Sequence, residues 1–360
     1  MRLRAGCTIT DLPIGDSVEL HGSVSERDAS AADRALQLAK NGPAHGPNPR
    51  VGCVLTNTAG RVIGEGWHRG AGTPHAEVAA LSDALARGHE ARGATAYVTL
   101  EPCSHTGRTG PCTQALMDAG VTRVRYAVED PNPEAAGGGE VLRSNGIDAV
   151  FAPADAAAAL NARWLIAVRR SRPYVIAKWA ATLDGRTAAV DGTSFWITGD
   201  EAREHAHGVR GEVDAIVVGT GTVLTDDPSL SARAQGEDSG HQPLRVVMGN
   251  RDTAGKKVWR DGNAVHARTH EPLAVLAQLQ QREARVVLIE GGSTVITAFL
   301  AAGLVDEIHA YIAPAILGAG TTAVGDLGIA TMNAALRGRE VSSRQLGVDT
   351  LVIAHVAKGN

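Results

Sequence analysis

Apolar runs of strand length alternate with helical stretches along this chain, and this alternation limits its fold more than any other feature. In the first half, "VGCVLT" (51–56) and "TAYVTL" (95–100) are typical of strands, whereas "AEVAALSDALARG" (76–88) is typical of a helix. The second half repeats the rhythm, with strands predicted at "DAIVVG" (214–219) and "RVVLIE" (285–290). Interleaved strands and helices form layered α/β domains, so we predict an α/β fold.

The chain is too long for one typical core, which indicates two domains. It has 360 residues, 44% of them hydrophobic, and single cores stop growing at about 250–300 residues. "DAAAALNARWLIAVRRSRP" is a helical stretch that ends in a basic cluster and Pro173, and we place the domain boundary there. We therefore predict a flexible N-terminal tail (1–25), a first domain (26–170) and a second domain (171–360).

Charge and composition exclude several kinds of partner. The formal net charge is −4, so no global basic field attracts nucleic acid or an acidic membrane surface. No apolar run reaches the roughly 18 residues of a membrane helix, and the N-terminal sequence lacks the apolar centre of a secretory signal. We expect a cytoplasmic protein with no nucleic-acid or membrane partner. Its four cysteines then indicate metal binding or catalysis rather than a disulfide framework.

Two short segments, "HAEV" (75–78) and "TLEPCSHTGRTGPC" (99–112), bring a histidine, a glutamate and two cysteines close together in the sequence. Three interpretations are open: a disulfide, a structural metal site or a catalytic site. His75, Cys103 and Cys112 offer the nitrogen and sulfur ligands that zinc prefers, and three protein ligands leave the fourth position open for water. A structural site normally closes all four positions, and the sequence has no fourth ligand nearby. We therefore favour a catalytic zinc. Cys53, in an apolar strand, is interpreted as a small buried hydrophobic residue.

Glu77 lies two residues after His75, and in a helix interior this spacing would point the two side chains in nearly opposite directions. Pro74 resolves the conflict because it marks a helix start, where first-turn side chains can share a site. Cys112 also opens a predicted helix, after Pro111, and a helix N-terminus stabilises a thiolate. His-x-Glu followed by Pro-Cys is typical of zinc nucleobase deaminases, in which zinc activates a water and the glutamate transfers protons.

The segment between the two cysteines is longer than is usual for deaminases. Eight residues separate Cys103 from Cys112, whereas the usual pattern has two. The inserted "SHTGRTGP" carries His105 and Arg108, and an insertion beside a metal site is suited to reading the substrate. Asn48 in "GPNPRVGCV" has an amide able to pair with the edge of a heterocycle, although the segment also fits a plain turn before a strand.

The second half contains a strand, a glycine turn and a helix in "RVVLIEGGSTVITAFL" (285–300). Backbone N–H groups at such a helix start form an anion site that suits cofactor phosphates, although an ordinary strand-to-helix turn has the same pattern. "GTGTVL" (219–224) has only two glycines of the dinucleotide-binding G-x-G-x-x-G, and no acidic residue is clearly placed about twenty positions later. We therefore predict no Rossmann domain.

Several motifs in both halves of the chain resemble those of a known family. "HGPNPRVGCV", "GEGWHRGAGTPHAEVAAL", "TLEPCSHTGRTGPC" and "DPNPEAAGGG" resemble the deaminase domain of bifunctional riboflavin-biosynthesis proteins, in which the long cysteine spacing is normal. "KWAATLDGRTA", "WITGDEAREHAHGVR", "VGTGTVLTDDPSLSAR" and "IEGGST" resemble the reductase domain of the same family. The resemblance covers about residues 28 to 320, in the expected order.

The resemblance implies a cytidine-deaminase-like α/β/α domain followed by a dihydrofolate-reductase-like α/β domain. It implies zinc-dependent hydrolytic deamination of 2,5-diamino-6-ribosylamino-4(3H)-pyrimidinone 5′-phosphate. It also implies reduction of the ribosyl side chain by NADPH, which gives 5-amino-6-ribitylamino-uracil 5′-phosphate. The expected cofactors are therefore Zn²⁺ and NADPH, the expected partner is a small phosphorylated pyrimidine, and a homo-oligomer is expected.

The resemblance also implies the roles of individual residues, with Glu77 as the catalytic residue. Implied deaminase substrate contacts are Asn48, His105, Arg108, Asp130 and Asn132. Implied reductase substrate contacts are Ser194, Arg210, Arg233 and Glu290. Implied NADPH contacts are Ala180, Trp196, Thr222, Asp226, Gly292, Ser293, Thr294, Val295, Ile296 and Thr297. No role is assigned to Lys178 or Asp184.

Two other functions remain as alternatives. One is a deaminase of free bases, nucleosides or tRNA whose second half is a regulatory binder. A nucleic-acid editor needs a basic groove that bears aromatic residues, whereas aromatic residues make up only 3% of this acidic chain. The other is a zinc-stabilised scaffold, which has no use for Glu77 beside the metal.

Overall fold

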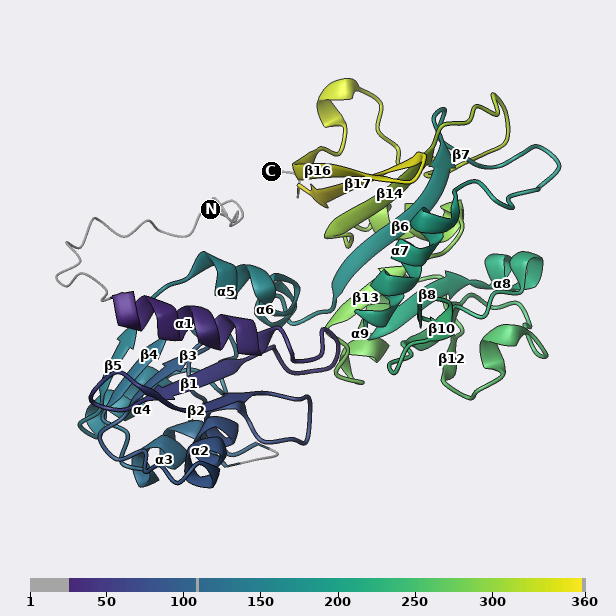
Figure 1. The fold of residues 1–360 in the computed structure, drawn as a ribbon. Helices are drawn as coiled ribbons and strands as arrows, with labels where there is room; N and C mark the ends of the chain where they lie inside the picture. The colour runs from purple at the N-terminus through teal and green to yellow at the C-terminus, as the bar shows by residue number, and fades with distance from the viewer. Residues whose placement is uncertain (1–25, 108–109, 358–360) are drawn as a thin grey trace, which may run out of the picture.

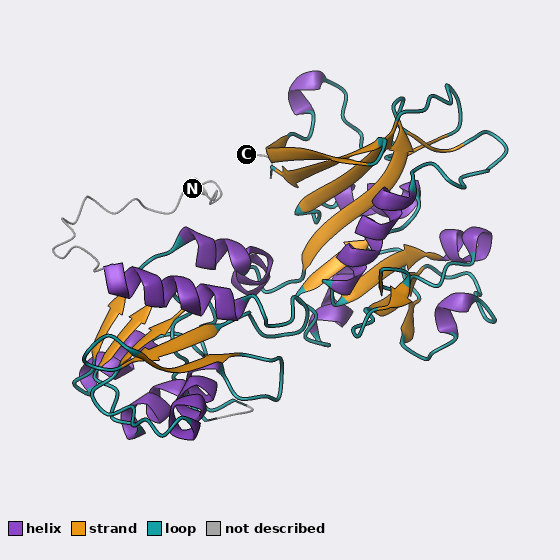
Figure 2. Cartoon of the chain, viewed as in Figure 1, coloured by secondary structure: helices purple, strands orange, loops and turns teal. Residues whose placement is uncertain are grey.

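The computed structural model describes residues 26–107 and 110–357 and divides them into two α/β domains (Figure 1). The chain passes from the first domain to the second between helix α6 (Ala162–Arg169) and strand β6 (Tyr174–Thr182). Both domains combine sheets with helices (Figure 2), so the predicted α/β class is confirmed. The predicted tail, residues 1–25, lies outside the described residues.

The first domain is built on a five-stranded sheet. Its strands are β1 (Gly52–Thr56), β2 (Val62–Trp67), β3 (Thr95–Val98), β4 (Arg123–Tyr126) and β5 (Asp148–Phe151), in the order β2-β1-β3-β4-β5. The sheet is mixed, because β1 pairs antiparallel with β2 and β3, whereas β3, β4 and β5 are parallel. Its helices, besides α6, are α1 (Glu26–Ala39), α2 (Ala76–Ala86), α3 (Cys112–Asp118), α4 (Gly138–Ser144) and α5 (Asp155–Leu160).

The alternation of side chains along β1 and β3 divides this domain into layers. Val54 and Tyr97 point to the face covered by α1 and pack against Ala35 and other small residues of that helix. Their neighbours Cys53 and Val98 point to the opposite face and belong to the core that α2, α3 and α4 share. Figure 1 shows α5 beside α1 above the sheet. Cys53 is fully buried, as predicted for a small hydrophobic residue.

The second domain is built on an eight-stranded sheet in the order β12-β11-β8-β13-β6-β14-β17-β16. The strands from β12 to β14 are parallel to their neighbours, and β17 and β16 add an antiparallel edge. Besides β6, this sheet contains β8 (Ala215–Gly219), β11 (Leu244–Met248), β12 (Ala264–Ala267), β13 (Val286–Ile289), β14 (Glu307–Ala313), β16 (Gly338–Leu346) and β17 (Asp349–Val356). Two small sheets pair β7 (Arg186–Ala188) with β15 (Thr321–Thr322) and β9 (Arg233–Ala234) with β10 (Glu237–Asp238).

Helices cover both faces of the central parallel strands, which explains why β8 and β13 are apolar at every position. Val217 and Ile289 face a core shared with α9 (Pro272–Gln280) and α10 (Ser293–Ala301). Ile216 and Leu288 face the opposite core, with α7 (Asp200–Gly211) and α8 (Thr220–Asp226). No helix in the described ranges, 26–107 and 110–357, combines the length and apolar character needed to cross a bilayer.

Two local predictions differ from the structure. The helical stretch predicted before Pro173 is two helices, α5 and α6, because Asn161 between them leaves the helical path. Its side chain accepts a hydrogen bond from the backbone N of Arg50 at 2.9 Å and donates one to the backbone O of Arg50 at 2.8 Å. The segment "GTGTVL", considered only as a glycine turn, forms most of helix α8.

The two domains are joined by packing and by ion pairs at α6. Leu165 of this helix belongs to the core of the first domain, whereas Ala167 belongs to a core of the second. Arg163 pairs with the buried carboxylate of Glu307 in β14 at 2.7 Å. The helix therefore connects both cores, and the first domain contacts the second where strand β14 begins.

Candidate functional site

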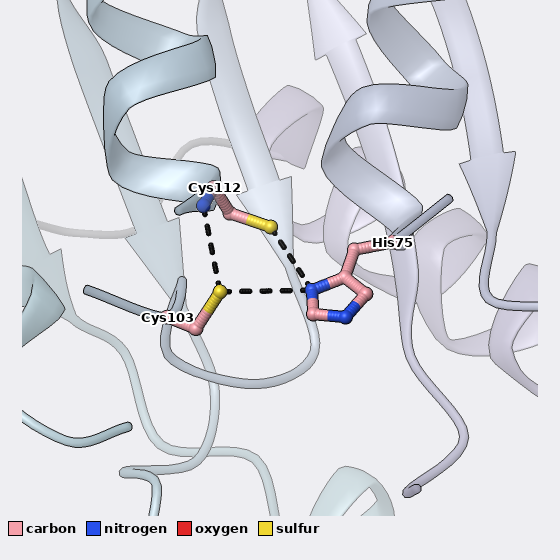
Figure 3. Close-up of side chains that lie close together, drawn as sticks. All are labelled: His75, Cys103 and Cys112. Atoms are coloured by element: carbon pink, nitrogen blue, oxygen red, sulfur yellow. Dashed lines mark hydrogen bonds between the residues drawn. The ribbon is translucent and has the colours of Figure 1, made fainter. Parts of the chain in front are cut away.

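His75, Cys103 and Cys112 meet in the first domain (Figure 3). The Nδ1 atom of His75 lies 3.2 Å from Sγ of Cys112 and 3.6 Å from Sγ of Cys103. The three ligand atoms all lie within 4.8 Å of one another, and no fourth His, Cys, Asp or Glu in the described part of the chain joins this group. The sequence prediction that these three residues cluster is therefore confirmed.

Helix starts position two of these side chains. His75 is the N-cap of α2, and Cys112 is the first residue of α3, directly after Pro111. The backbone N of Cys112 also donates a hydrogen bond to Sγ of Cys103 at 3.4 Å. Contact with Cys112 and His75 lowers the pKa of the Cys103 thiol to about 4, which favours the thiolate that binds metal.

The geometry fits a tetrahedral zinc. Zn–N and Zn–S bonds of about 2.0 and 2.3 Å place tetrahedral nitrogen and sulfur ligands about 3.5 Å apart. The distances of 3.2 and 3.6 Å from His75 to the two sulfur atoms lie on either side of that value. A site with three protein ligands keeps one position for water, which distinguishes a catalytic zinc from a structural one.

Glu77 lies in the first turn of α2, beside the ligands, and is 3% exposed. Burial raises the pKa of its carboxyl to about 6. A carboxyl with this pKa both accepts and releases a proton near neutral pH, which is what a group that transfers protons requires.

A cavity of about 320 Å³ opens beside this cluster. Asn48 lines it, and the Asn48 Nδ2 donates a hydrogen bond to Nε2 of His68 at 2.9 Å. His68 is held in turn by its Nδ1, which lies 3.1 Å from the backbone O of Pro74. Burial lowers the pKa of His68, so the ring is neutral and fixes the orientation of the Asn48 amide.

Asp130 and Asn132 line the same cavity on the loop that follows β4. Glu101 holds this loop: one carboxylate oxygen accepts the backbone N–H of Gly139 at 2.8 Å, and the other accepts that of Asp130 at 3.2 Å. Glycine is required at position 138, because a Cβ there would lie 1.7 Å from the backbone O of Pro102. The loop is thereby held against the segment that carries Cys103.

The loop between the cysteines reaches the cavity through His105. Its Nδ1 is buried without a hydrogen-bond partner among the described residues, so a substrate atom has a polar group to meet there. Arg108, the other residue singled out in this loop, lies outside the described residues.

A second cavity, of about 450 Å³, lies in the second domain. Glu290 lines it with a side chain that is 5% exposed, and its carboxylate lies 2.7 Å from Nη2 of Arg210 and 3.4 Å from Nζ of Lys178. Burial alone would raise the pKa of Glu290, but the charges of Arg210 and Lys178 lower it to about 2. The Glu290 carboxylate therefore remains charged at neutral pH.

The glycine turn after β13 forms one wall of this cavity, and α10 begins at Ser293 on that wall. The Oγ1 of Thr222 accepts a hydrogen bond from the backbone N of Gly292 at 3.1 Å. A Cβ at Gly291 would lie 2.6 Å from Cβ of Val295, so only glycine lets the turn pack this closely. The N-terminus of α10 thus faces the cavity with the polarity that anions prefer.

The residues implied as reductase contacts divide into those that line this cavity and those that do not. Arg233 lies in the exposed strand β9, and Trp196 is 71% exposed under the guanidinium of Arg203. The cavity wall includes Ala180, Ser194, Arg210, Thr222, Asp226, Glu290, Gly292, Ser293 and Ile296. It does not include Trp196, Arg233, Thr294, Val295 or Thr297 among the described lining residues.

Sequence reasoning missed three residues of these sites, His68, Glu101 and Arg285, and assigned no role to a fourth, Lys178. His68 and Glu101 each hold a cavity segment from behind, and Lys178 completes the charged group around Glu290. Arg285 belongs to the second domain yet lines the cavity of the first. Glu101 could have been found from the sequence, because it directly precedes the Pro-Cys motif. Arg285 could not, because its position at this cavity depends on the packing of the two domains.

Comparisons with protein families agree with this division. The family model for the cytidine and deoxycytidylate deaminase zinc-binding region matches residues 25–128. The family model for the RibD C-terminal domain matches residues 173–352.

Similar proteins match nearly the whole chain. The riboflavin biosynthesis protein RibD of Mycobacterium tuberculosis is 44% identical, over 93% of this chain and 98% of its own length. The RibD of Escherichia coli is 41% identical over 79% and 87%. The solved structure of Acinetobacter baumannii RibD superposes with a TM-score of 0.84 at 37% identity, over 92% of this chain and 99% of that one. A Thermotoga maritima structure, described as a diaminohydroxyphosphoribosylaminopyrimidine deaminase/5-amino-6-(5-phosphoribosylamino)uracil reductase, gives 0.78 at 32% identity, over 91% and 98%.

Proposed function

The chain belongs to the RibD family of riboflavin biosynthesis proteins, and we propose that the two cavities described above are its two active sites. RibD is the bifunctional deaminase and reductase of this pathway, and the chain has both domains. The observation that carries the proposal is the His75–Cys103–Cys112 cluster, with buried Glu77 beside it, on the wall of a cavity.

In the deaminase cavity, the substrate is the phosphorylated diaminopyrimidine for which the Thermotoga maritima relative is described. His75, Cys103 and Cys112 would hold zinc, which supplies the acidity that makes a water nucleophilic at neutral pH. Glu77 accepts the proton from that water and delivers it to the departing amino group. Asn48, Asp130 and Asn132 orient the pyrimidine, and His105 and Arg108 read its substituents. Hydrogen bonds between His68 and Asn48 and between Glu101 and the 130–132 loop fix both segments, so the groups that bind the pyrimidine are in place before it binds.

In the reductase cavity, NADPH is the proposed hydride donor. Support comes from the α10 N-terminus, which suits a phosphate, and from the hydroxyls of Thr222 and Ser293 on the same wall. Arg210 and Lys178, both paired with Glu290, supply two positive charges to the wall of this cavity, which suits a phosphorylated substrate. Ser194 and Glu290 contact the substrate in this proposal. Hydride transfer chiefly requires that the protein bind and orient the two reactants.

Three organisational proposals accompany this function. The domain limits 26–170 and 171–360 are supported by the passage from α6 to β6. Cytoplasmic location is supported by the free thiols of Cys53, Cys103 and Cys112. A homo-oligomer is supported by exposed apolar side chains on and beside edge strand β16, namely Met332, Leu336, Val341 and Val348, and light scattering measures it directly.

One experiment tests the proposed function. The purified full chain, loaded with zinc, is incubated with the phosphorylated diaminopyrimidine, first alone and then with NADPH. We expect release of ammonia in both reactions and oxidation of NADPH only in the second. Release of ammonia from cytidine or adenosine, with none from the phosphorylated diaminopyrimidine, would contradict the proposal.

A further inference from the structure

The described residues of the deaminase cavity supply few positive charges for a substrate that bears a phosphate. His68 is neutral because burial lowers its pKa, and His75 belongs to the zinc cluster. Arg285 is the one arginine or lysine among the described residues that line the cavity. The described wall carries the carboxylates of Glu77, Glu101, Asp130, Glu134 and Glu283.

Arg285 reaches this cavity from the other domain. It directly precedes β13 of the reductase sheet, and its backbone N donates a hydrogen bond to Oδ2 of Asp214 at 2.7 Å. Its Nε donates to the backbone O of Pro47 at 3.3 Å, and Trp164 donates to the same oxygen at 2.8 Å. Pro47 is the neighbour of Asn48, so the guanidinium lies beside the residue assigned to the pyrimidine.

The guanidinium has donors to spare for a ligand. Nε is used by Pro47, and neither terminal nitrogen makes a hydrogen bond to a residue in the described part of the chain. Arginine keeps its charge at any physiological pH, and its planar donors match two phosphate oxygens at once. Arg285 also lines a third cavity, of about 370 Å³, between the domains, so it lies where the deaminase cavity meets the reductase domain.

We propose that Arg285, a residue of the reductase domain, binds the phosphate group of the deaminase substrate. The proposal rests on the proposed function, because it names the phosphate-binding residue of that same site. It makes the deaminase site incomplete without the second domain. It also gives the bifunctional chain a specific role: the reductase domain selects the phosphorylated form of the pyrimidine for the deaminase.

The test compares two substrates on the full chain, the phosphorylated diaminopyrimidine and its dephosphorylated form. Arg285→Ala should raise KM for the phosphorylated substrate about 10- to 100-fold, as expected for a lost charge-assisted contact. It should leave kcat/KM for the dephosphorylated substrate nearly unchanged. Arg285→Lys should recover part of the loss, because it keeps the charge without the planar donors.

Arg282→Ala is the matched control, because Arg282 is exposed three residues earlier and does not line the cavity. Reduction of separately deaminated substrate reports that the second domain of each variant is folded. An unchanged KM in Arg285→Ala would overturn the proposal. An equal loss on both substrates would also overturn it, because it would assign Arg285 only to holding Pro47. If the wild-type chain deaminates neither substrate, the proposed function itself fails, which is a different result.

Discussion

The carboxylate of Asp214 in the second domain accepts a hydrogen bond from the backbone N of Gly46 in the first. Its other oxygen accepts the backbone N–H groups of Arg285 at 2.7 Å and Val286 at 2.8 Å. One side chain thus fixes the 43–50 loop of the deaminase to the first residues of a reductase strand. Stacking of His45 on His241, with ring centroids 3.5 Å apart, supports the same junction.

Asp214→Ala should therefore impair the deaminase although Asp214 is not in that domain. Three backbone N–H groups lose their acceptor, each at a cost of about 1–3 kcal/mol if it stays buried, and the loop that carries Asn48 loses its anchor. We expect deaminase kcat/KM to fall about 10-fold or more, with a smaller change in the reductase. Steady-state kinetics on each half-reaction measure this, with the exposed Glu237→Ala as control. Equal losses in both activities would indicate general unfolding instead.

Zinc content tests the ligand assignment. The wild-type protein should hold about one zinc per chain. Cys103→Ser should lose the metal, because serine is a poor zinc ligand beside His75 and Cys112. Cys53→Ser should keep it, since Cys53 is buried in strand β1 and is not one of the three clustered residues. Elemental analysis of the three purified proteins decides the matter, and equal metal loss in the two variants would contradict the assignment.

Glu77→Gln should separate metal binding from proton transfer. The amide has the same shape and leaves the three ligands intact, but it cannot carry a proton, so deamination should fall by about 10²-fold or more. Zinc content and the reduction of pre-deaminated substrate should persist, because the reductase cavity is in the other domain. Normal deamination by this variant would remove Glu77 from the mechanism.

Acid should remove the stabilisation that Glu290 provides. Its pKa is about 2 in the folded protein, below its ordinary value of 4.5. Its contribution is therefore complete above pH 4.5 and is lost as the pH falls towards 2. Glu290→Gln should lower the free energy of unfolding by about 3 kcal/mol at pH 7 and by much less near pH 3.

Urea unfolding at both pH values measures this loss of stability. The control variant Glu237→Gln, at an exposed carboxylate, should lose no stability at either pH. A pH-independent loss would mean that the ion pairs with Arg210 and Lys178 are not its source.

The strands, the zinc cluster and the two-domain division were predictable because each depends on local pattern. Apolar runs bounded by turns define β1, β3, β8 and β13, and Pro74 and Pro111 mark the helix starts that bring His75 and Cys112 together. These signals lie within a few residues of the structure that they predict.

Supporting and interdomain contacts were not predictable in the same way. Asn161 divides a helical pattern because its amide bonds to Arg50, which is 111 residues away. His68 and Glu101 act through residues that are near only in space. Arg285 reaches the deaminase cavity only because the two domains pack together, at α6 and at the contact between Asp214 and Gly46. Such contacts depend on the tertiary structure, and no local pattern in one sequence encodes them.

The reductase site should prefer NADPH to NADH. A 2′-phosphate adds roughly two negative charges, and an NAD-selective site commonly places a carboxylate on the ribose hydroxyls. The wall formed by the glycine turn and α10 presents backbone N–H groups and the hydroxyls of Thr222 and Ser293. Asp226 is the one carboxylate besides Glu290 among the described residues of that cavity, and burial raises its pKa.

We therefore expect kcat/KM with the deaminated substrate to be higher for NADPH than for NADH. Each factor of ten corresponds to about 1.4 kcal/mol of differential transition-state binding. A preference for NADH would refute the prediction, whereas equal values would mean that the 2′-phosphate extends into solvent. Asp226→Asn distinguishes these cases further: if Asp226 lies near the phosphate, this variant should increase the preference for NADPH.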